Sequence, residues 1–230
     1  MPHVHVHAPH ELTESPGHGQ GKSGAPERGE RLLELFAILL LSLTTLATAW
    51  SGYQAARWSG EQSQSFARAS TMRIKSQAQS TLAGQLRIDD LVMFNSWLDA
   101  REAGDGELAA IYRRRFRPEF LPAFEAWTAQ RPFTSRSAVP GPLYMPEYRL
   151  AETSRAAELD AQADELYRAG TAAKANDDHY ILSTLFFAAV LFFAGISLRL
   201  DWRPLRYVVL GMAGVMLLAG AGYVLSLPVA

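Results

Sequence analysis

Residues 35–53, LFAILLLSLTTLATAWSGY, decide the class of this chain, because they contain no charged side chain. At about 1.5 Å of rise per residue, a helix of this length crosses a hydrocarbon core of about 30 Å. Residues 180–198 and 207–227 form two further apolar runs without a charge. One such run fits a buried helix of a soluble protein, but three in a chain of 230 residues predict three transmembrane helices, at 31–53, 180–198 and 207–227.

The segment between the first two runs, residues 54–179, is predicted to be a helical domain outside the membrane. No proline occurs from Glu27 to Arg117, and the residues after the first run favour or tolerate helix. We therefore expect the first span to continue outward as one long helix, with the tight packing at its end distal to the membrane. A second long helix, from about Glu147, is expected to run into the second span. The predicted fold is all-α, with three transmembrane helices, a long antiparallel helical hairpin and a small helical cap between spans 1 and 2.

The cap is predicted from residues 104–146. Gly104, Asp105 and Gly106 indicate a helix stop and a cap for the next helix, and Pro118 and Pro122 divide the adjoining aromatic segment into two short helices. Five aromatic residues recur at about every fourth position, which predicts a core that covers the distal apolar face of the long helix. The aromatic residues are Tyr112, Phe116, Phe120, Phe124 and Trp127, and the apolar face is Leu86, Met93 and Trp97. Residues 131–146, which contain four prolines, are expected to form an irregular strap.

Composition and motifs exclude several classes of function. The formal net charge of −1 argues against a nucleic-acid partner, and the absence of cysteine excludes disulfides, thiolate metal sites and cysteine nucleophiles. The chain has no Gly-rich phosphate loop, no nucleophile elbow and no zinc-protease helix, and no charged residue lies inside the apolar runs 35–53, 180–198 and 207–227, where a proton or ion relay would need one. We therefore expect no enzymatic activity and no cofactor.

The N-terminal residues 1–30 are predicted to be a disordered, His-rich tail, because they contain too few large apolar residues to form a core. Neutral imidazoles in this tail would together hold Zn, Ni or Cu, although loose spacing without a fold limits such a site to weak binding. The candidate metal ligands are His3, His5, His7 and His10. His179 has no paired ligand nearby and is expected at the membrane interface.

Small and weakly polar residues in the spans are candidates for close helix packing. Thr44, Thr48 and Ser51 recur at helical spacing in the first span, and Gly211 and Gly214 lie in the third. Packing within this chain is the favoured interpretation, and packing between chains is the alternative.

Four arginines, Arg113, Arg114, Arg115 and Arg117, form the densest positive cluster. A helix spreads such residues around its circumference, so a solvated surface paired with neighbouring acids is the favoured interpretation, and a partner surface for an anionic ligand or lipid headgroups is the alternative. Upstream, Asp89 and Asp90 interrupt an apolar face, and one of them is expected to be a buried acceptor paired with an arginine.

Charge and aromatic residues predict the orientation of the spans. The short loop 199–206 is basic, and basic residues also precede the first span. Because short basic segments stay in the cytoplasm, we expect the N-terminus inside, and the domain at 54–179 and the C-terminus outside. Aromatic belts mark the two boundaries: Trp50, Tyr53, Trp58, Tyr180 and Tyr223 on the domain side, and Trp202 and Tyr207 on the other.

Several segments resemble a recurrent group of uncharacterised bacterial three-span membrane proteins. They are AWSGYQAARWSGEQ, YRRRFRPEFLPAFEAW, PLYMPEYRLAE and LFFAAVLFFAGIS, which cover most of residues 31–198. The resemblance implies a bacterial cytoplasmic (inner) membrane but brings no activity or site residues. The chain is also similar in layout to stator subunits that couple proton flow to energy transduction, which place a helical region between spans 1 and 2. It lacks their Pro- and Gly-containing second span, however, and their polar pore positions.

The pattern of many packing signals and no chemical motif predicts a non-enzymatic integral membrane scaffold or interaction module. Its expected contacts are the lipid bilayer and a second copy in a homo-oligomer, through coiled-coil helices, or another membrane protein. A channel or transport component and a ligand-sensing membrane protein are the alternatives.

Overall fold

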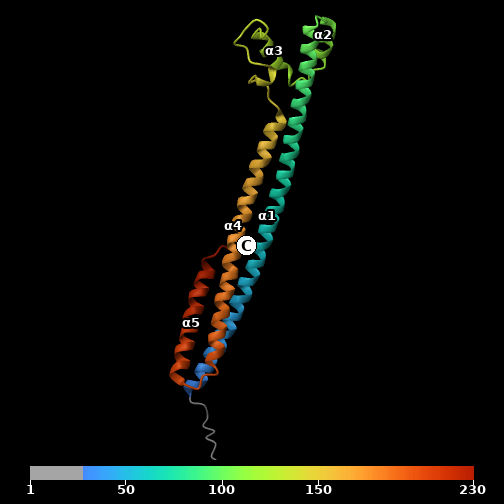
Figure 1. Ribbon diagram of the computed structural model, residues 1–230. Helices are drawn as coiled ribbons and strands as arrows, with labels where there is room; N and C mark the ends of the chain where they lie inside the picture. Colours follow the sequence, from blue (N-terminus) through green and yellow to red (C-terminus); the bar gives the residue numbers. More distant parts are fainter. Residues whose placement is uncertain (1–27) are drawn as a thin grey trace, which may run out of the picture.

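The computed structural model describes residues 28–230, and this part of the chain is helical without a strand. Figure 1 shows α1 and α4 side by side over most of the molecule, with α5 beside their lower part and α2 and α3 at the opposite end. Three of the helices, α1, α4 and α5, are long and apolar enough to cross a membrane. The elements are α1 (Arg28–Glu102), α2 (Gly106–Arg114), α3 (Leu121–Ala129), the 3₁₀ helix η1 (Pro142–Tyr144), α4 (Ala151–Ser197) and α5 (Arg203–Ser226).

Helix α1 runs without interruption from Arg28 to Glu102, as the absence of proline predicted, and it starts three residues before the predicted span. The chain turns away from the helix at Gly104, whose φ of 76° lies in the left-handed region that glycine adopts without strain. The Asp105 carboxylate then accepts the backbone N–H of Leu108 at 2.9 Å and caps α2. The predicted stop and cap are thus confirmed.

Helix α4 begins at Ala151, four residues later than expected, so the start at Glu147 was wrong. Residues 147–150 stay outside the helix, because Leu150 has an extended backbone and the Tyr148 hydroxyl donates a hydrogen bond to the Asp90 carboxylate at 2.9 Å. From Ala151 the helix continues to Ser197 and includes the second predicted span. Helix α5 starts at Arg203, inside the predicted loop, with a proline in its first turn.

The part of α1 and α4 beyond α5, residues 59–85 and 151–176, is here called the stalk. Its two helices meet through small buried side chains, among them Ala69 and Ala83 on α1 and Ala163 on α4. The Ser76 hydroxyl also donates to the Ala156 carbonyl across this contact, at 2.8 Å. The expected tight packing at the distal end is present, and the lower stalk is also closely packed, because small side chains let the helices approach where large apolar residues are lacking.

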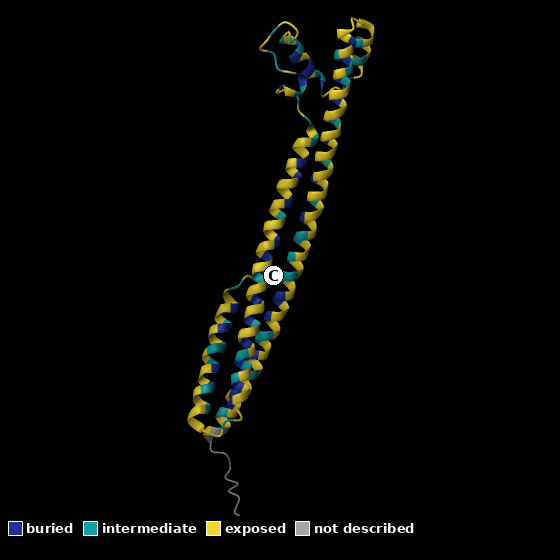
Figure 2. Cartoon of the chain, viewed as in Figure 1, coloured by how far each residue is buried: buried dark blue, intermediate teal, exposed yellow. Residues whose placement is uncertain are grey.

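Both contact faces in the stalk follow alternating steps of three and four residues, the spacing of a left-handed coiled coil. All residues at these positions are buried or half-buried, and Figure 2 shows buried residues along the line between the two helices. On α1 they are Gln62, Ser65, Ala69, Met72, Ser76, Gln79 and Ala83, and on α4 they are Ala156, Leu159, Ala163, Leu166, Gly170 and Ala173. On α1 the same spacing continues toward the head through Leu86, Asp90, Met93 and Trp97.

The outer faces of the two stalk helices lie opposite these contacts and are exposed. The back of α1 keeps the same spacing and consists of Gly60, Ser63, Ala67, Ser70, Ile74, Gln77, Thr81, Gly84, Ile88, Leu91 and Asn95. The back of α4 consists of Ala157, Glu158, Ala161, Asp164, Glu165, Arg168, Thr171, Ala172, Ala175 and Asp178. The back of α1 contains no charged residue, whereas half of the residues on the back of α4 are charged.

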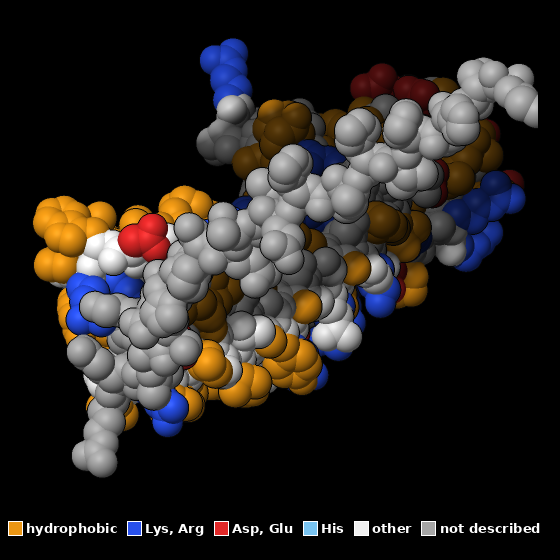
Figure 3. Space-filling model, turned by 90° about the horizontal axis from the view of Figure 1, so that it is seen from below, with side chains coloured by type: hydrophobic (Ala, Val, Ile, Leu, Met, Phe, Trp, Pro, Cys, Tyr) orange, Lys and Arg blue, Asp and Glu red, His pale blue; other side chains and the backbone are white. Residues whose placement is uncertain are grey.

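The part of the molecule that includes α5, here called the bundle, has a narrow apolar interior that includes Leu40, Val190 and Ala213. Its outer surface is also apolar, and Figure 3, which looks onto the bundle from below, shows hydrophobic side chains around it with Lys and Arg among them. Many large hydrophobic residues are exposed there, including Leu35, Ile38, Leu39, Leu43, Leu46, Leu182, Leu185, Phe192, Val208, Val215, Leu218 and Leu225.

At its stalk end, the bundle is closed by the chain after α5. The Pro228 carbonyl accepts hydrogen bonds from the Trp58 indole at 3.1 Å and the Tyr180 hydroxyl at 3.2 Å, and the backbone N–H of Ala230 donates to Gln54 Oε1 at 3.1 Å. Tyr180 is fully buried. Its ring therefore packs between the helices, and its place at the predicted membrane boundary stays a prediction.

Candidate functional site

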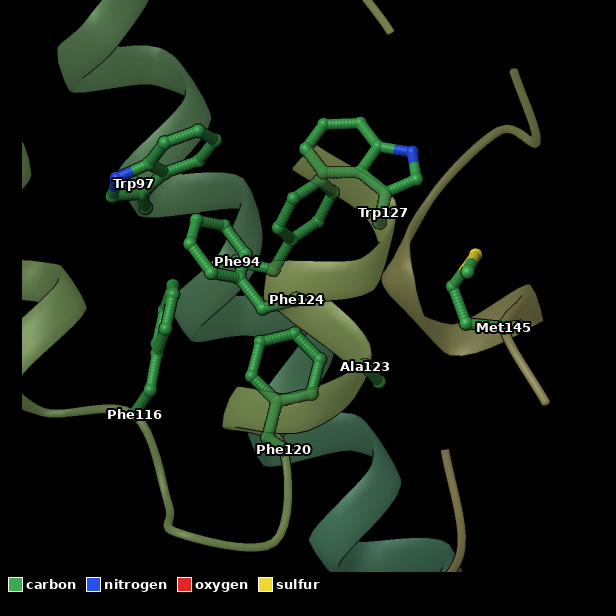
Figure 4. Close-up of a cluster of buried hydrophobic side chains, with 8 residues drawn as sticks. All are labelled: Phe94, Trp97, Phe116, Phe120, Ala123, Phe124, Trp127 and Met145. Atoms are coloured by element: carbon green, nitrogen blue, oxygen red, sulfur yellow. The ribbon is translucent and has the colours of Figure 1, made fainter. Parts of the chain in front are cut away.

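The head, residues 86–150 at the end of the stalk, has the largest hydrophobic cluster in the described part of the chain. Figure 4 shows aromatic side chains from α1, α3 and the segment between α2 and α3 pointing toward one another. Several contacts have edge-to-face geometry, among them Phe94 with Trp127 at 5.1 Å and Trp97 with Phe124 at 4.8 Å. The cluster consists of Phe94, Trp97, Phe116, Phe120, Ala123, Phe124, Trp127 and Met145.

The predicted aromatic stripe therefore lies in a core. Four of its five members are buried, and Tyr112 packs half-buried against them, as does Met93 of the predicted apolar face. Leu86 does not belong to the cluster. These side chains close the head and are not available as an exposed platform for a partner.

An ion pair holds the base of the head together. The Asp90 carboxylate on α1 is almost fully buried and accepts hydrogen bonds from Arg117 Nε at 3.0 Å, Arg117 Nη2 at 2.8 Å and the Tyr148 hydroxyl at 2.9 Å. The hydrogen bond to Asp90 raises the pKa of Arg117. Burial, together with the hydrogen bond to Asp90, raises the pKa of Tyr148. The predicted buried acceptor is thus Asp90, and it links α1, the turn after α2 and the segment just before α4.

The four arginines do not act as one surface. Arg117 belongs to the buried ion pair, and Arg113 is exposed and lies 3.5 Å from Glu125. Arg114 and Arg115 are exposed and make no ion pair with another residue of the described range 28–230. Of the four arginines, these two are the ones without an ion pair within residues 28–230.

A hollow of about 520 Å³ lies between the end of α1, α2 and α3. Trp97 and Phe124 supply aromatic surface, and Arg101 and Arg113 supply positive charge. A second hollow of about 300 Å³ shares Arg101 and adds Phe133. The Arg101 guanidinium lies 4.3 Å from the Phe133 ring centroid and 5.5 Å from that of Trp97. Positive charge beside aromatic faces suits an anionic group attached to an apolar or aromatic body.

The sequence did not reveal these hollows. Arg101 and Phe133 belong to separate predicted elements, and neither lies in a charge cluster or an aromatic repeat. The only signal in the sequence was the density of aromatic and arginine residues between 97 and 133.

The predicted packing residues of the bundle lie mostly in contacts within the chain. Thr44 and Ser51 are fully buried, Thr48 is half-buried, and the Thr44 hydroxyl donates to the Leu40 carbonyl at 2.6 Å. A Cβ atom on Gly214 would lie 3.6 Å from the Phe36 ring, whereas one on Gly211 would meet open space. Gly211 therefore faces outward.

No metal site is found among residues 28–230, where no three His, Asp or Glu side chains come together. His179 is exposed, and its Nδ1 lies 2.9 Å from the Tyr223 hydroxyl, so that it joins α4 to α5. The predicted metal ligands His3, His5, His7 and His10 lie outside the described residues.

The bundle has no charged pathway: within the described residues its buried polar side chains are Thr44, Ser51, Gln54, Ser183 and Ser197. Its cavity between α4 and α5, about 200 Å³, is almost entirely apolar. No protein-family model, curated protein or solved structure matches the chain. Its function is therefore inferred from the stalk, the head and the bundle themselves.

Proposed function

We propose that this chain is a non-enzymatic membrane scaffold, in which a bundle anchored in a bilayer holds an interaction head at a fixed distance from the membrane surface. The observation that carries the proposal is the single helix α1, which runs from the bundle to the head and is paired with α4 along the stalk. Residues 54–102 span about 70 Å at the helical rise of about 1.5 Å per residue. Because α1 is uninterrupted and paired with α4, it would hold the head at this distance from the bundle.

The contrast between bundle and stalk supports the anchoring. Large apolar side chains turned outward in water would be costly, and in a hydrocarbon core they are not. We propose the bacterial cytoplasmic membrane, with the basic loop after α4 in the cytoplasm and the head outside. The bacterial origin rests on the resemblance to bacterial three-span proteins and stays a prediction.

The surface of the head supports an interaction role. Leu108 and Ile111 on α2 are exposed apolar residues one turn apart, and Arg114 and Arg115 lie at the end of the same short helix. Together with the hollows around Arg101, this surface fits a protein partner that presents acidic and aromatic side chains. Because the larger hollow also has the volume of a small-molecule site, ligand sensing is the second candidate function.

Anchoring and orientation are tested together with single cysteines, since the chain has none. Ser137→Cys in the strap should react with a membrane-impermeant thiol reagent in intact spheroplasts, and Asp201→Cys in the loop between α4 and α5 should react only after lysis. Purified chain should float with liposomes and resist extraction by alkaline carbonate. The reverse labelling pattern would overturn the orientation, and extraction by carbonate would overturn the anchoring.

The interaction role is tested with a photo-crosslinking amino acid at Ile111 or Arg114 in native membranes. A discrete adduct with one protein species is expected there. Ala161 on the back of α4 serves as the matched control and should give no adduct. Equal, diffuse labelling at both places would contradict an interaction head, and loss of the adduct on addition of a small anionic aromatic compound would favour ligand sensing.

A further inference from the structure

The exposed back of α1 is unusual for a helix outside a membrane. It runs from Gly60 to Asn95 without a charged residue, and three of its large apolar side chains are exposed: Ile74 by 68%, Ile88 by 61% and Leu91 by 43%. Charged residues of α1 in this range, such as Arg73 and Arg87, occur only beside this face or toward α4. A helix face in permanent contact with water normally carries charges.

Helix α4 provides the comparison within the same molecule. Its back lies on the opposite side of the stalk, along part of this length, and it carries Glu158, Glu165, Arg168 and Asp178, together with Asp164, which pairs with Arg73 of α1 at 2.8 Å. The two helices share one environment and one coiled-coil contact, so the environment alone does not explain why only one back is uncharged. The difference indicates that the back of α1 is covered by another surface.

We infer that a second copy of this chain covers it, so that two α1 helices pack back to back in a parallel dimer. The shape of the face favours another long helix, because it is a narrow strip of about 50 Å at the rise of about 1.5 Å per residue. The strip keeps the spacing of three and four residues that α1 uses toward α4. A helix that follows this supercoil stays in contact along the strip.

A second copy also meets the strip in register, and here the inference rests on the proposed membrane anchoring. Two copies inserted in the same orientation have parallel α1 helices at equal depth, so each residue on the back of α1 faces its own counterpart across a twofold axis. Uncharged residues then meet uncharged residues, without like-charge repulsion. The small residues Ala67, Ser70 and Gly84 allow close approach, and Ile74 and Ile88 supply apolar contact.

The available area is sufficient for a stable dimer. Exposed uncharged residues at the same spacing continue along α1 into the bundle, through Leu46, Leu39 and Leu32. The uncharged strip therefore extends over about 95 Å at about 1.5 Å per residue. With a contact width of about 10 Å, each partner would bury roughly 950 Å², against about 800 Å² per partner in a specific interface of standard size.

The test uses single cysteines in the full chain, reconstituted in liposomes at a low ratio of protein to lipid. Ile74→Cys, Thr81→Cys and Ile88→Cys should each form a disulfide-linked dimer on mild oxidation, because the paired Cα atoms would lie within disulfide reach, about 4.4–6.8 Å. The matched controls Ala161→Cys and Ala172→Cys, on the back of α4, should stay monomeric. A scan from residue 74 to residue 81 should give maxima three to four residues apart.

A second variant separates the interface from the fold. Ile74→Glu combined with Ile88→Glu should abolish the disulfide at Thr81→Cys, while the thermal unfolding midpoint stays unchanged, because both isoleucines are exposed in the single chain. The same pair of glutamates at Ala161 and Ala172 should leave the cross-link intact. Flotation of every variant with liposomes is measured in parallel.

Each outcome has one meaning. Flotation without a periodic cross-link on the back of α1, or cross-links of equal strength on the back of α4, would overturn the dimer and leave the proposed scaffold standing. Failure of the wild-type chain to float would overturn the scaffold itself. In native membranes, a disulfide adduct of Ile74→Cys with a different protein would overturn the second copy as the occupant.

Discussion

The head and the stalk are built on the same long helices, yet they hold together by different means. The head buries six large aromatic side chains and an ion pair, whereas the stalk buries mainly alanine, glycine and serine. A large apolar side chain contributes about 1.5–3 kcal/mol on burial, and an alanine contributes far less because it has less area to bury. The stalk is therefore stabilised by many small contacts repeated over several turns, whereas the head is stabilised by one compact aromatic core.

The largest expected effect comes from the aromatic core. Trp127→Ala removes a buried ring whose indole N–H donates to the Val139 carbonyl, and should destabilise the head by about 3–5 kcal/mol. Hydrogen exchange of the full chain in detergent should show protection lost in residues 86–150 and kept in the lower stalk. The control Tyr144→Ala, an exposed ring, should change little. Unchanged protection in the Trp127 variant would contradict the separation of head and stalk.

The ion pair should give the next largest effect. Arg117→Met leaves the buried Asp90 carboxylate unpaired and should cost about 3 kcal/mol. The double variant Asp90→Leu with Arg117→Met should cost less than Arg117→Met alone, because it removes the unpaired charge. Denaturant unfolding of both variants and of Asp90→Leu completes the double-mutant cycle. Arg114→Met, at an exposed cation, serves as the control, and equal losses in it and in Arg117→Met would rule out a structural role for the pair.

In the stalk, the sensitive change is the addition of bulk. A Cβ atom on Gly170 would lie 2.6 Å from the Phe66 ring, so Gly170→Val should destabilise the hairpin by about 1–3 kcal/mol. Phe66→Ala in the same chain should relieve part of this loss. Ala172→Val on the exposed back of α4 is the matched control, and thermal unfolding of the three variants makes the comparison. A Gly170→Val midpoint equal to that of the control would show that the two helices are not closely packed there.

The smallest effect is a dependence on pH in the head. Burial raises the pKa of Tyr148 above the usual value of about 10, so in the unfolded chain this phenol ionises first. Stability contributed by the neutral phenol is therefore present below about pH 10 and is lost as the pH rises above it. Wild-type chain should lose stability from about pH 9 to about pH 11, as measured by urea unfolding relative to Tyr148→Phe. Parallel curves for the two proteins would exclude this linkage.

The sequence predicted local features well. The continuity of α1 followed from the absence of proline between residues 27 and 117, and the start of α2 followed from the glycines around Asp105. These features depend only on the conformations that neighbouring residues allow. The stripe of aromatic residues likewise identified most of the core, because its spacing matches one helix face.

Features that depend on distant partners were not predictable in the same way. Four arginines lie close together in the sequence, and only the turn after α2 directs Arg117 toward Asp90. The contact of Arg101 with Phe133 arises because the strap returns past the end of α1. The uncharged back of α1 is visible in the sequence, but its exposure depends on which face of α1 is occupied by α4.

The arrangement of hydrogen bonds along the hairpin has a consequence for the order of folding. Asp90 and Arg117 are separated by 27 residues, Ser76 and Ala156 by 80, and Trp58 and Pro228 by 170. Because the entropy lost on loop closure grows with loop length, the shortest loop closes at the lowest cost. Once the head has formed, α4 starts beside the distal end of α1, and each further turn pairs without closing a new loop. We expect the hairpin to close like a zipper from the head toward the bundle.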